Sequence, residues 1–421
     1  MRVILMNLTV FDYFQLKGTL AIAPIPILPY IEILEFSYMR LEHLKNRTLL
    51  FSIIAAVVCK SCIDPIAPDF ELREDLIFIE GFASTEPGVS FVTISISAIE
   101  FGVYVVNFVE DASVNFENMD TGDIVPLQEI DEAYVTPDNF GVNPGESWKL
   151  NIQMPNGKEY TSEIEKVLEP IPLNNVRAVY DPELEFREIF GGTFVPGHEI
   201  LVSFTDPPEL GNYYYWTYRG YENLNLCEKC RESYFRDGEC QPLPRNVGGL
   251  QPYYDYPCIT DCWRIRFPES IPIFEDQFSN GLTITDFSIG NALLYTNEDI
   301  VIEVQQLVIS SAAHEYYKVL KDLIDNNSGL NAPPPAGLIG NIFNPADSEE
   351  FVFGRFTAAA TSVASVFVDR TFIREEALEG REPLITEPTF GSPLPPPATV
   401  LVPCSETRSR TAIRPEAWID Q

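Results

Sequence analysis

Short runs that alternate apolar and polar residues recur along most of the chain. Residues 76–81 (LIFIEG) and 91–99 (FVTISISAI) show this alternation, and Glu-Pro-Gly at 86–88 marks a turn between them. A period of two is typical of a strand with one buried face. The Asn-Gly at 156–157 is a strong signal for a tight hairpin. The pattern predicts a mainly β protein that begins with an immunoglobulin-like β-sandwich over residues 76–170.

A second, larger β-rich domain with one or two short helices is predicted over residues 171–375. Residues 199–205 (EILVSFT) and 300–310 (IVIEVQQLVIS) are among its predicted strands. The clearest helix covers residues 311–325, because apolar residues recur on one face and serines stand at its start. Residues 376–421 are charged and Pro-rich without a period. We expect them to form an extended tail that packs over the surface or is partly disordered.

A leader precedes the predicted β region. A positively charged flank and an apolar run, too short to cross a bilayer, lead into a small residue and Cys62. This order predicts a lipoprotein signal peptide over residues 39–61, lipidation of Cys62 and a tether over residues 62–75. Residues 1–38 are broken by prolines, and we expect translation to start at Met39 instead. The alternative is an ordinary signal peptide, or a core helix with incidental cysteines.

The composition is strongly acidic. The chain carries 28 Lys and Arg against 62 Asp and Glu, which gives a formal net charge of −34. This balance argues against nucleic acid as a partner, because phosphate binding needs a basic face. Acidity identifies no ligand by itself, since an acidic surface usually serves solubility.

Six cysteines follow the predicted lipidation site, and they are our candidates for disulfide bonds: Cys227, Cys230, Cys240, Cys258, Cys262 and Cys404. Five of them fall in one irregular loop, residues 227–262. A Cys-x-x-Cys followed by a Cys-x-x-x-Cys could hold a structural zinc ion. An even number of cysteines in an exported protein more often forms disulfides, so we favour disulfides and no metal. Six cysteines allow 15 pairings, and the sequence does not choose among them.

Motifs for catalysis are missing from the sequence. His198 and His314 have no accompanying nucleophile motif, and the signatures of zinc proteases, phosphate-binding loops and calcium loops do not occur. We therefore expect packing or surface roles for both histidines, no cofactor and no enzymatic activity. The abundant carboxylates leave a glycosidase-like acid–base pair as the minority alternative.

The most aromatic run of the chain, residues 212–221 (NYYYWTYRGY), is the candidate for ligand binding. On a strand, Tyr213 and Tyr215 would share one face, and Trp216 and Tyr218 would share the other. Aromatic side chains offer a large contact area at low entropic cost and stack on sugars, peptides or other flat groups. The alternative is a core strand, since aromatic residues are common in strands.

Several blocks of the chain are similar to a known family. They are the IDP that follows Cys62, the strand LIFIEG, the Tyr-Trp run at 213–216, Cys262-Trp263, and a late block from Val304 (VQQLVISSAAHEYYKVLKDL) through APPPAGLIGNIFNP to the FGRF at 353–356. In these blocks the chain resembles Bacteroidota outer-membrane lipoproteins of unknown function (DUF4249-like), which are often encoded beside TonB-dependent receptors. The resemblance implies a lipid-anchored β protein at the outer membrane, and it supplies no catalytic or binding residues.

Ligand capture is the function we expect from these features. The protein would be anchored through Cys62 to the outer membrane, face the cell surface and act as an accessory to a TonB-dependent outer-membrane receptor. A structural or adhesive envelope lipoprotein without a transported ligand is the first alternative. A carboxylate-dependent hydrolase is the second.

Overall fold

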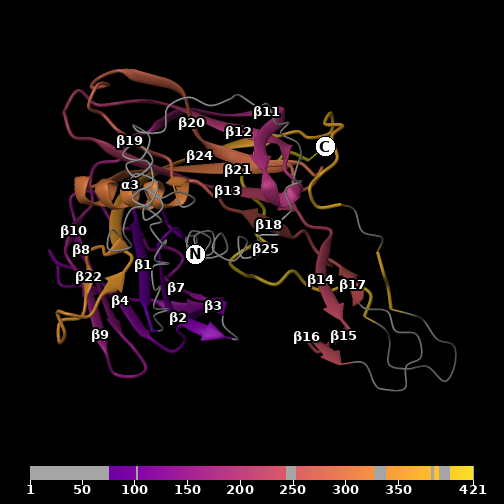
Figure 1. Cartoon of the computed structure of the whole chain (residues 1–421), viewed down its shortest axis with the longest axis horizontal. Helices are drawn as coiled ribbons and strands as arrows, with labels where there is room; N and C mark the ends of the chain where they lie inside the picture. Colours follow the sequence, from indigo (N-terminus) through magenta and orange to yellow (C-terminus); the bar gives the residue numbers. More distant parts are fainter. Residues whose placement is uncertain are drawn as a thin grey trace, which may run out of the picture. The chain divides into compact units, whose positions relative to one another are not determined.

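The described residues fold into β-sheets with one α-helix, which confirms the predicted mainly β class (Figure 1). The computed structural model describes residues 75–100, 103–242, 253–326, 338–380, 384–387 and 399–420. The predicted upstream segment, the signal peptide, Cys62 and nearly all of the tether lie outside these residues. Within them, no helix has the length and apolarity needed to cross a membrane.

The largest sheet has twelve strands, which come from both ends of the chain. Along its main path the order is β25 (Arg410–Thr411), β18 (Trp263–Arg266), β13 (Tyr213–Asn223), β21 (Ile300–Ile309), β24 (Phe356–Val368), β1 (Ile77–Ser84), β2 (Phe91–Glu100), β7 (Ala133–Val135) and β6 (Gln128–Ile130). Three further strands pair beside this path, β19 (Ile273–Glu275) with β13, β23 (Val352–Phe353) with β1, and β3 (Val103–Phe108) with β2. Strands from both sides of the predicted boundary at residue 170 therefore share one sheet, and the described residues lie in one compact unit.

Four smaller sheets complete the described structure. The six-stranded sheet consists of β22 (Ile342–Phe343), β9 (Glu159–Ser162), β8 (Ser147–Gln153), β4 (Ser113–Asn118), β5 (Ile124–Pro126) and β10 (Glu165–Lys166). The three-stranded sheet consists of β11 (Leu173–Arg187), β12 (Thr193–Thr205) and β20 (Thr283–Leu293), with a 3₁₀ turn, η1 (Glu188–Phe190), between β11 and β12. Two two-stranded sheets pair β14 (Leu226–Arg231) with β17 (Tyr253–Pro257) and β15 (Ser233–Arg236) with β16 (Glu239–Pro242).

The two halves of the large sheet are joined where β24 pairs in parallel with β1, placing Phe356 opposite Gly81. Just before β24, Gly354 has a φ of 101°, a conformation that side chains disfavour. A Cβ at Gly354 would also collide with the carbonyl oxygen of Ile79. The glycine is therefore required for the close approach of the two backbones at this junction.

Two apolar layers fill the space between facing sheets. One lies between the large sheet and the six-stranded sheet and contains the buried side chains of Ile79, Phe116 and Trp148. The other lies between the large sheet and the three-stranded sheet and contains Phe204 and Trp216. Each layer is filled from both of its sheets, as strands with one buried face require. The described part of the chain is thus built from two β-sandwiches that share one sheet.

Helix α3 (Ser311–Asn326) packs against β13 and β19 of the large sheet (Figure 1). The Oγ of Ser310 accepts a hydrogen bond from the backbone N–H of Ala313 at 3.2 Å, which caps the helix where the sequence predicts its start. Tyr317 of the helix stacks on Tyr215 of β13, with ring centroids 4.8 Å apart. The face of β13 that carries Tyr215 is therefore covered by α3.

The described end of the predicted tail, residues 399–420, packs on the large sheet. Its strand β25 pairs with β18, and Trp418 contacts Trp263 with ring centroids 4.4 Å apart. A disulfide joins Cys404 of the tail to Cys262, directly before β18. This part of the chain is extended and held over the surface, one of the two forms we expected.

Candidate functional site

The aromatic run lies on β13 and belongs mostly to the core. Trp216 is fully buried, and its indole N–H donates a hydrogen bond of 3.0 Å to Oε1 of Gln306. Tyr215 is buried beneath α3, and Tyr213 is half-buried beside the ring of His314. Of the four aromatic candidates, only Tyr218 lines the large cavity described below. The strand therefore packs against the three-stranded sheet on one face and against α3 on the other.

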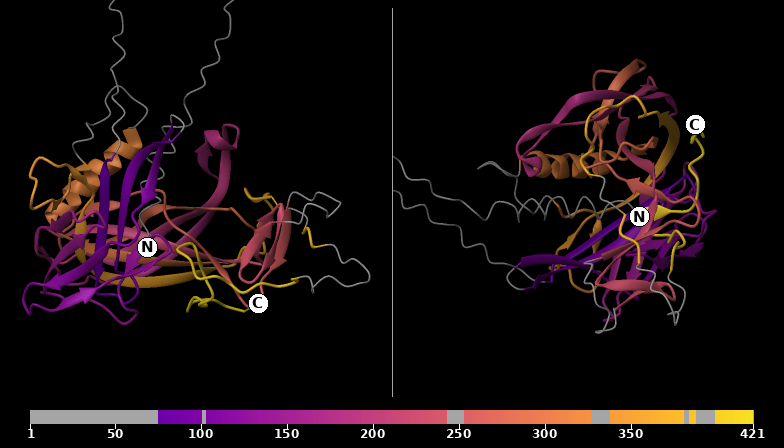
Figure 2. Two further views of the ribbon diagram at one scale, coloured as in Figure 1. Left: turned by 90° about the horizontal axis from the view of Figure 1, so that it is seen from below. Right: turned by 90° about the vertical axis from the view of Figure 1, so that its right-hand side faces the viewer.

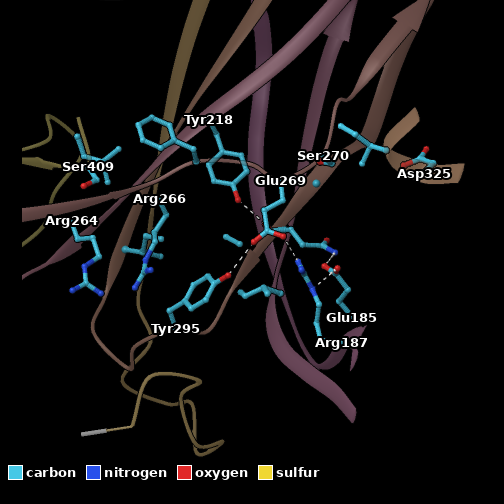
Figure 3. Close-up of a pocket in the computed structure, with 18 residues that line it drawn as sticks. Glu185, Arg187, Tyr218, Arg264, Arg266, Glu269, Ser270, Tyr295, Asp325 and Ser409 are labelled. Atoms are coloured by element: carbon cyan, nitrogen blue, oxygen red, sulfur yellow. Dashed lines mark hydrogen bonds and ion pairs between the residues drawn. The ribbon is translucent and has the colours of Figure 1, made fainter. Parts of the chain in front are cut away.

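A cavity of about 720 Å³ opens beside Tyr218 (Figure 3). Its walls come from β11, β13, β18, β20, the loop after β18 and the last turn of α3. The charged and aromatic residues of this lining are Glu185, Arg187, Tyr218, Arg264, Arg266, Phe267, Glu269, Tyr295 and Asp325. The volume is in the range of small-molecule binding sites, roughly 300–1,000 Å³. Three arginines at one cavity are notable in a chain with so few basic residues.

Arg187 lies at the centre of one charged group in the cavity. Its Nε is 2.8 Å from Oε1 of Glu185, and its Nη2 is 2.7 Å from Oε2 of Glu269. Burial would lower the pKa of Arg187, but the carboxylates outweigh burial and raise it. The hydroxyl of Tyr295 donates to Oε1 of Glu269 at 3.2 Å, and the amide of Asn291 donates to Oε2 of Glu185 at 3.1 Å. This group presents alternating donors and acceptors to the cavity.

Arg264 and Arg266 form a second charged group, because alternate residues of β18 point to the same side. Arg266 is 2.8 Å from Glu379 through Nη2 and 3.0 Å from Glu222 through Nε. Arg264 reaches the other oxygen of Glu379 at 2.6 Å. The guanidinium of Arg266 also lies over the ring of Tyr295, 4.3 Å from its centroid. Arg264 is 35% exposed, and Glu379 is its only ion-pair partner among the described residues, so it keeps N–H donors for a ligand.

A buried ion pair supports this second group from behind. Glu222 is 2% exposed, and its Oε1 is 2.8 Å from Nη1 of the completely buried Arg370. The same nitrogen also donates to the backbone carbonyls of Thr296 and Glu298, both at 3.3 Å. Burial lowers the pKa of Arg370, and the charge of Glu222 opposes this shift. Charged contacts therefore run without a break from Arg370 in the core through Glu222 to Arg266 at the cavity.

A neighbouring cavity of about 500 Å³ is also lined by Arg264 and Glu379 of this second charged group. Its other lining residues come from the end of β13, the start of β14 and the turn between them, from the segment after β20, and from residues 376–380. Arg264 lines both cavities, so its guanidinium is the charged group best placed to contact a ligand in either of them.

The cysteines form three disulfides, which confirms that interpretation. They join Cys227 to Cys258, Cys230 to Cys240 and Cys262 to Cys404, across sequence separations of 31, 10 and 142 residues. The sulfur atoms of Cys227, Cys262 and Cys404 lie within 4.8 Å of one another. Each already belongs to a disulfide, so none offers the thiolate that zinc needs. The last disulfide holds the start of β18, the strand that presents Arg264 and Arg266.

Both described histidines are buried and lie outside the cavity lining. His198 lies in β12 beside the ring of Tyr180, and burial lowers its pKa to about 3. His314 lies on α3 against Tyr213, and burial lowers its pKa as well. Such neutral, packed imidazoles fit the packing roles that we expected.

The charged residues of the cavity were not among the candidates predicted from the sequence. Arg187, Glu269 and Tyr295 come from three separate segments, and their neighbours in the sequence carry no motif. The only usable signal was the spacing of Arg264 and Arg266, because two arginines separated by one residue are unusual in so acidic a chain. The sequence pattern predicts no strand at these residues. No feature of the sequence indicated the carboxylates that face these arginines.

The fold and the site define a mainly β, disulfide-bonded protein with a charged cavity and a single described α-helix. A family model described as "Domain of unknown function (DUF4249)" matches residues 63–365. The chain belongs to this family. The match begins directly after Cys62 and ends within β24, so it includes all of the cavity lining except Ser409. No curated protein matches the chain.

Proposed function

We propose that this protein captures a polar ligand in the cavity of about 720 Å³. The observation that supports the proposal is the alternation of guanidinium and carboxylate groups around one space, with tyrosines between them. Because each charge is already paired, the wall is rigid and close to electrically balanced. It favours a ligand that offers both hydrogen-bond donors and acceptors over a simple ion.

The acidic part of such a ligand would contact Arg264. Arg187 and Arg266 are each held by two carboxylates, whereas Arg264 is held by Glu379 alone among the described residues. A guanidinium has five N–H donors in a planar fork, which suits a carboxylate or another planar acceptor. The ring of Tyr295, which contacts Arg266 in the same cavity, offers an apolar surface for the rest of the ligand.

The proposed location is the outer membrane, with Cys62 as the lipid anchor and the binding domain facing the cell surface. The three disulfides support an oxidising compartment outside the cytoplasm. The order of a positively charged flank, an apolar run and a cysteine in the leader supports lipidation of Cys62. The resemblance to lipoproteins encoded beside TonB-dependent receptors supports such a receptor as the partner, to which the ligand would be passed.

Ligand binding is tested with the full-length protein purified from its own membrane. Native mass spectrometry would show a small molecule of reproducible mass on the wild-type protein. Arg264→Gln removes a charged hydrogen-bond donor, so we expect occupancy to fall about tenfold or more. Arg177→Gln is the matched control, because Arg177 is also a strand arginine held by one carboxylate, Asp286, outside the cavity. Equal occupancy in Arg264→Gln and wild type would overturn the assignment of the cavity.

The transporter role is tested by a pull-down in mild detergent through a C-terminal tag. A stoichiometric TonB-dependent barrel supports the accessory role. A lipidated protein recovered alone favours a structural or adhesive function, for which no transported ligand is needed. Absence from the membrane fraction refutes the anchor at Cys62, and turnover that depends on a single Asp or Glu would favour a hydrolase.

A further inference from the structure

The long hairpin of β11 and β12 ends in a tip, residues 185–195, that pairs with no third strand. β20 pairs with β12 only from Gly197 to Thr205, whereas Glu185, Phe186 and Arg187 continue to pair with β12 alone. The tip stands out from the large sheet in Figure 2 (left, magenta). The tip is therefore a two-stranded element, and no third described strand pairs with either of its edges.

Large apolar side chains are exposed on this hairpin tip. They are between 37% and 67% exposed, and they are Phe186, Ile189, Phe190 and Phe194. Phe186 and Phe194 are direct cross-strand partners and pack edge to face, with ring centroids 5.5 Å apart. Because side chains alternate along a strand, Glu185 and Arg187 point to the cavity while Phe186 points away from it. The tip thus has a polar inner side and an apolar outer side.

We propose that this hairpin tip is a docking element for a partner protein, and that it inserts into an apolar recess edged by lysines or arginines. The apolar outer side supplies the contact area that an interface core needs. The acidic Glu183 and Glu188 flank it and complement a basic rim. A left-handed Gly191, whose N–H donates to the carbonyl of Glu188 at 3.1 Å, fixes the turn before binding.

A partner protein fits the tip better than a membrane or a second copy of this chain. Insertion into lipid would carry Glu188, which directly precedes Ile189 and Phe190, into the apolar region or against anionic headgroups. Two copies would bring together chains of net charge −34, and their repulsion opposes association. A basic-rimmed protein recess avoids both costs.

This docking proposal does not depend on the ligand proposed for the cavity, because the apolar outer side and the cavity lie on opposite sides of the hairpin. A photo-crosslinking amino acid at Ile189 of the full-length protein, expressed in its own envelope, tests it. The control position is Phe278, which is 88% exposed on another loop. We expect one discrete crosslinked protein from Ile189 and none of comparable yield from Phe278. The crosslinked peptide of the partner should combine apolar residues with flanking Lys or Arg.

Two variants complete the test. Their binding is measured with the purified partner protein that the crosslink identifies. Ile189→Ser removes an exposed anchor and should weaken binding about thirtyfold, the size typical of an interface hot spot. Glu188→Lys should reduce the crosslink yield strongly at low salt, because it places like charges together. Both positions are exposed, so the unfolding transition should not move. A crosslink to lipid or to a second copy, equal yield from Phe278, or no crosslink would each overturn the proposal.

Discussion

Replacing Glu222 with glutamine should destabilise the protein severely, although the change is nearly isosteric. Glu222 is the buried carboxylate between Arg370, which is completely buried, and Arg266 at the cavity. Without its charge, Arg370 keeps only backbone carbonyls as close hydrogen-bond acceptors for its Nη1. Burying a guanidinium that has lost its paired carboxylate raises the free energy of the folded state, because the lost hydration is not replaced.

The magnitude follows from the burial of the pair. Removing one partner of a buried ion pair costs about 3–5 kcal/mol, because the remaining charge is uncompensated. The glutamine retains a carbonyl oxygen that can still accept one hydrogen bond, so we expect about 3 kcal/mol for Glu222→Gln. Arg266 should suffer less, since it is partly exposed and keeps its contact with Glu379.

Urea denaturation measures the effect as a lower midpoint with an unchanged slope. Asp286→Asn is the matched control, because it neutralises an exposed carboxylate paired with Arg177, and it should cost less than about 1 kcal/mol. The double variant Glu222→Leu/Arg370→Met removes both buried charges and should be more stable than Glu222→Gln. The reasoning is refuted if Glu222→Gln costs no more than Asp286→Asn, or if the double variant is the less stable of the two.

Two further predictions concern the disulfides and the response to pH. Replacing Cys262 and Cys404 by serine should lower the free energy of unfolding by about 5 kcal/mol, because this disulfide closes a loop of 142 residues. Replacing Cys230 and Cys240 should lower it by about 2.7 kcal/mol, because their loop spans 10 residues. Equal losses of stability in urea denaturation would contradict this order. His198 has a pKa of about 3 in the folded protein, below its ordinary value of 6.5. The unfolded chain therefore binds the proton more readily, and stability is lost as pH falls below 6.5 towards 3, by roughly 3 kcal/mol at pH 4. The wild-type protein should lose this amount relative to His198→Gln between pH 7 and pH 4, and parallel stability curves would exclude the effect.

The sequence by itself determined the class of the fold and the chemistry of its crosslinks. A period of two follows from the backbone geometry of a strand, so alternation in residues 76–81 and 91–99 was sufficient to predict β structure. The helix at Ser311–Asn326 was equally local, because its cap and its apolar face lie within sixteen residues. The disulfides were predicted from the even number of cysteines and from the predicted signal peptide. Each of these features depends on neighbours along the chain.

Only the tertiary structure decided which faces are buried and where the charges meet. The aromatic strand β13 has sheets or a helix on both sides, and its sequence is the same whether a face is covered or exposed. Arg187 and Glu269 are far apart in the sequence and meet because β11 passes the loop after β18. The pairing of the six cysteines and the parallel contact of β1 with β24 are long-range in the same way. Local sequence fixes the direction of each side chain relative to its own strand, and only the packing of distant strands places two such side chains together.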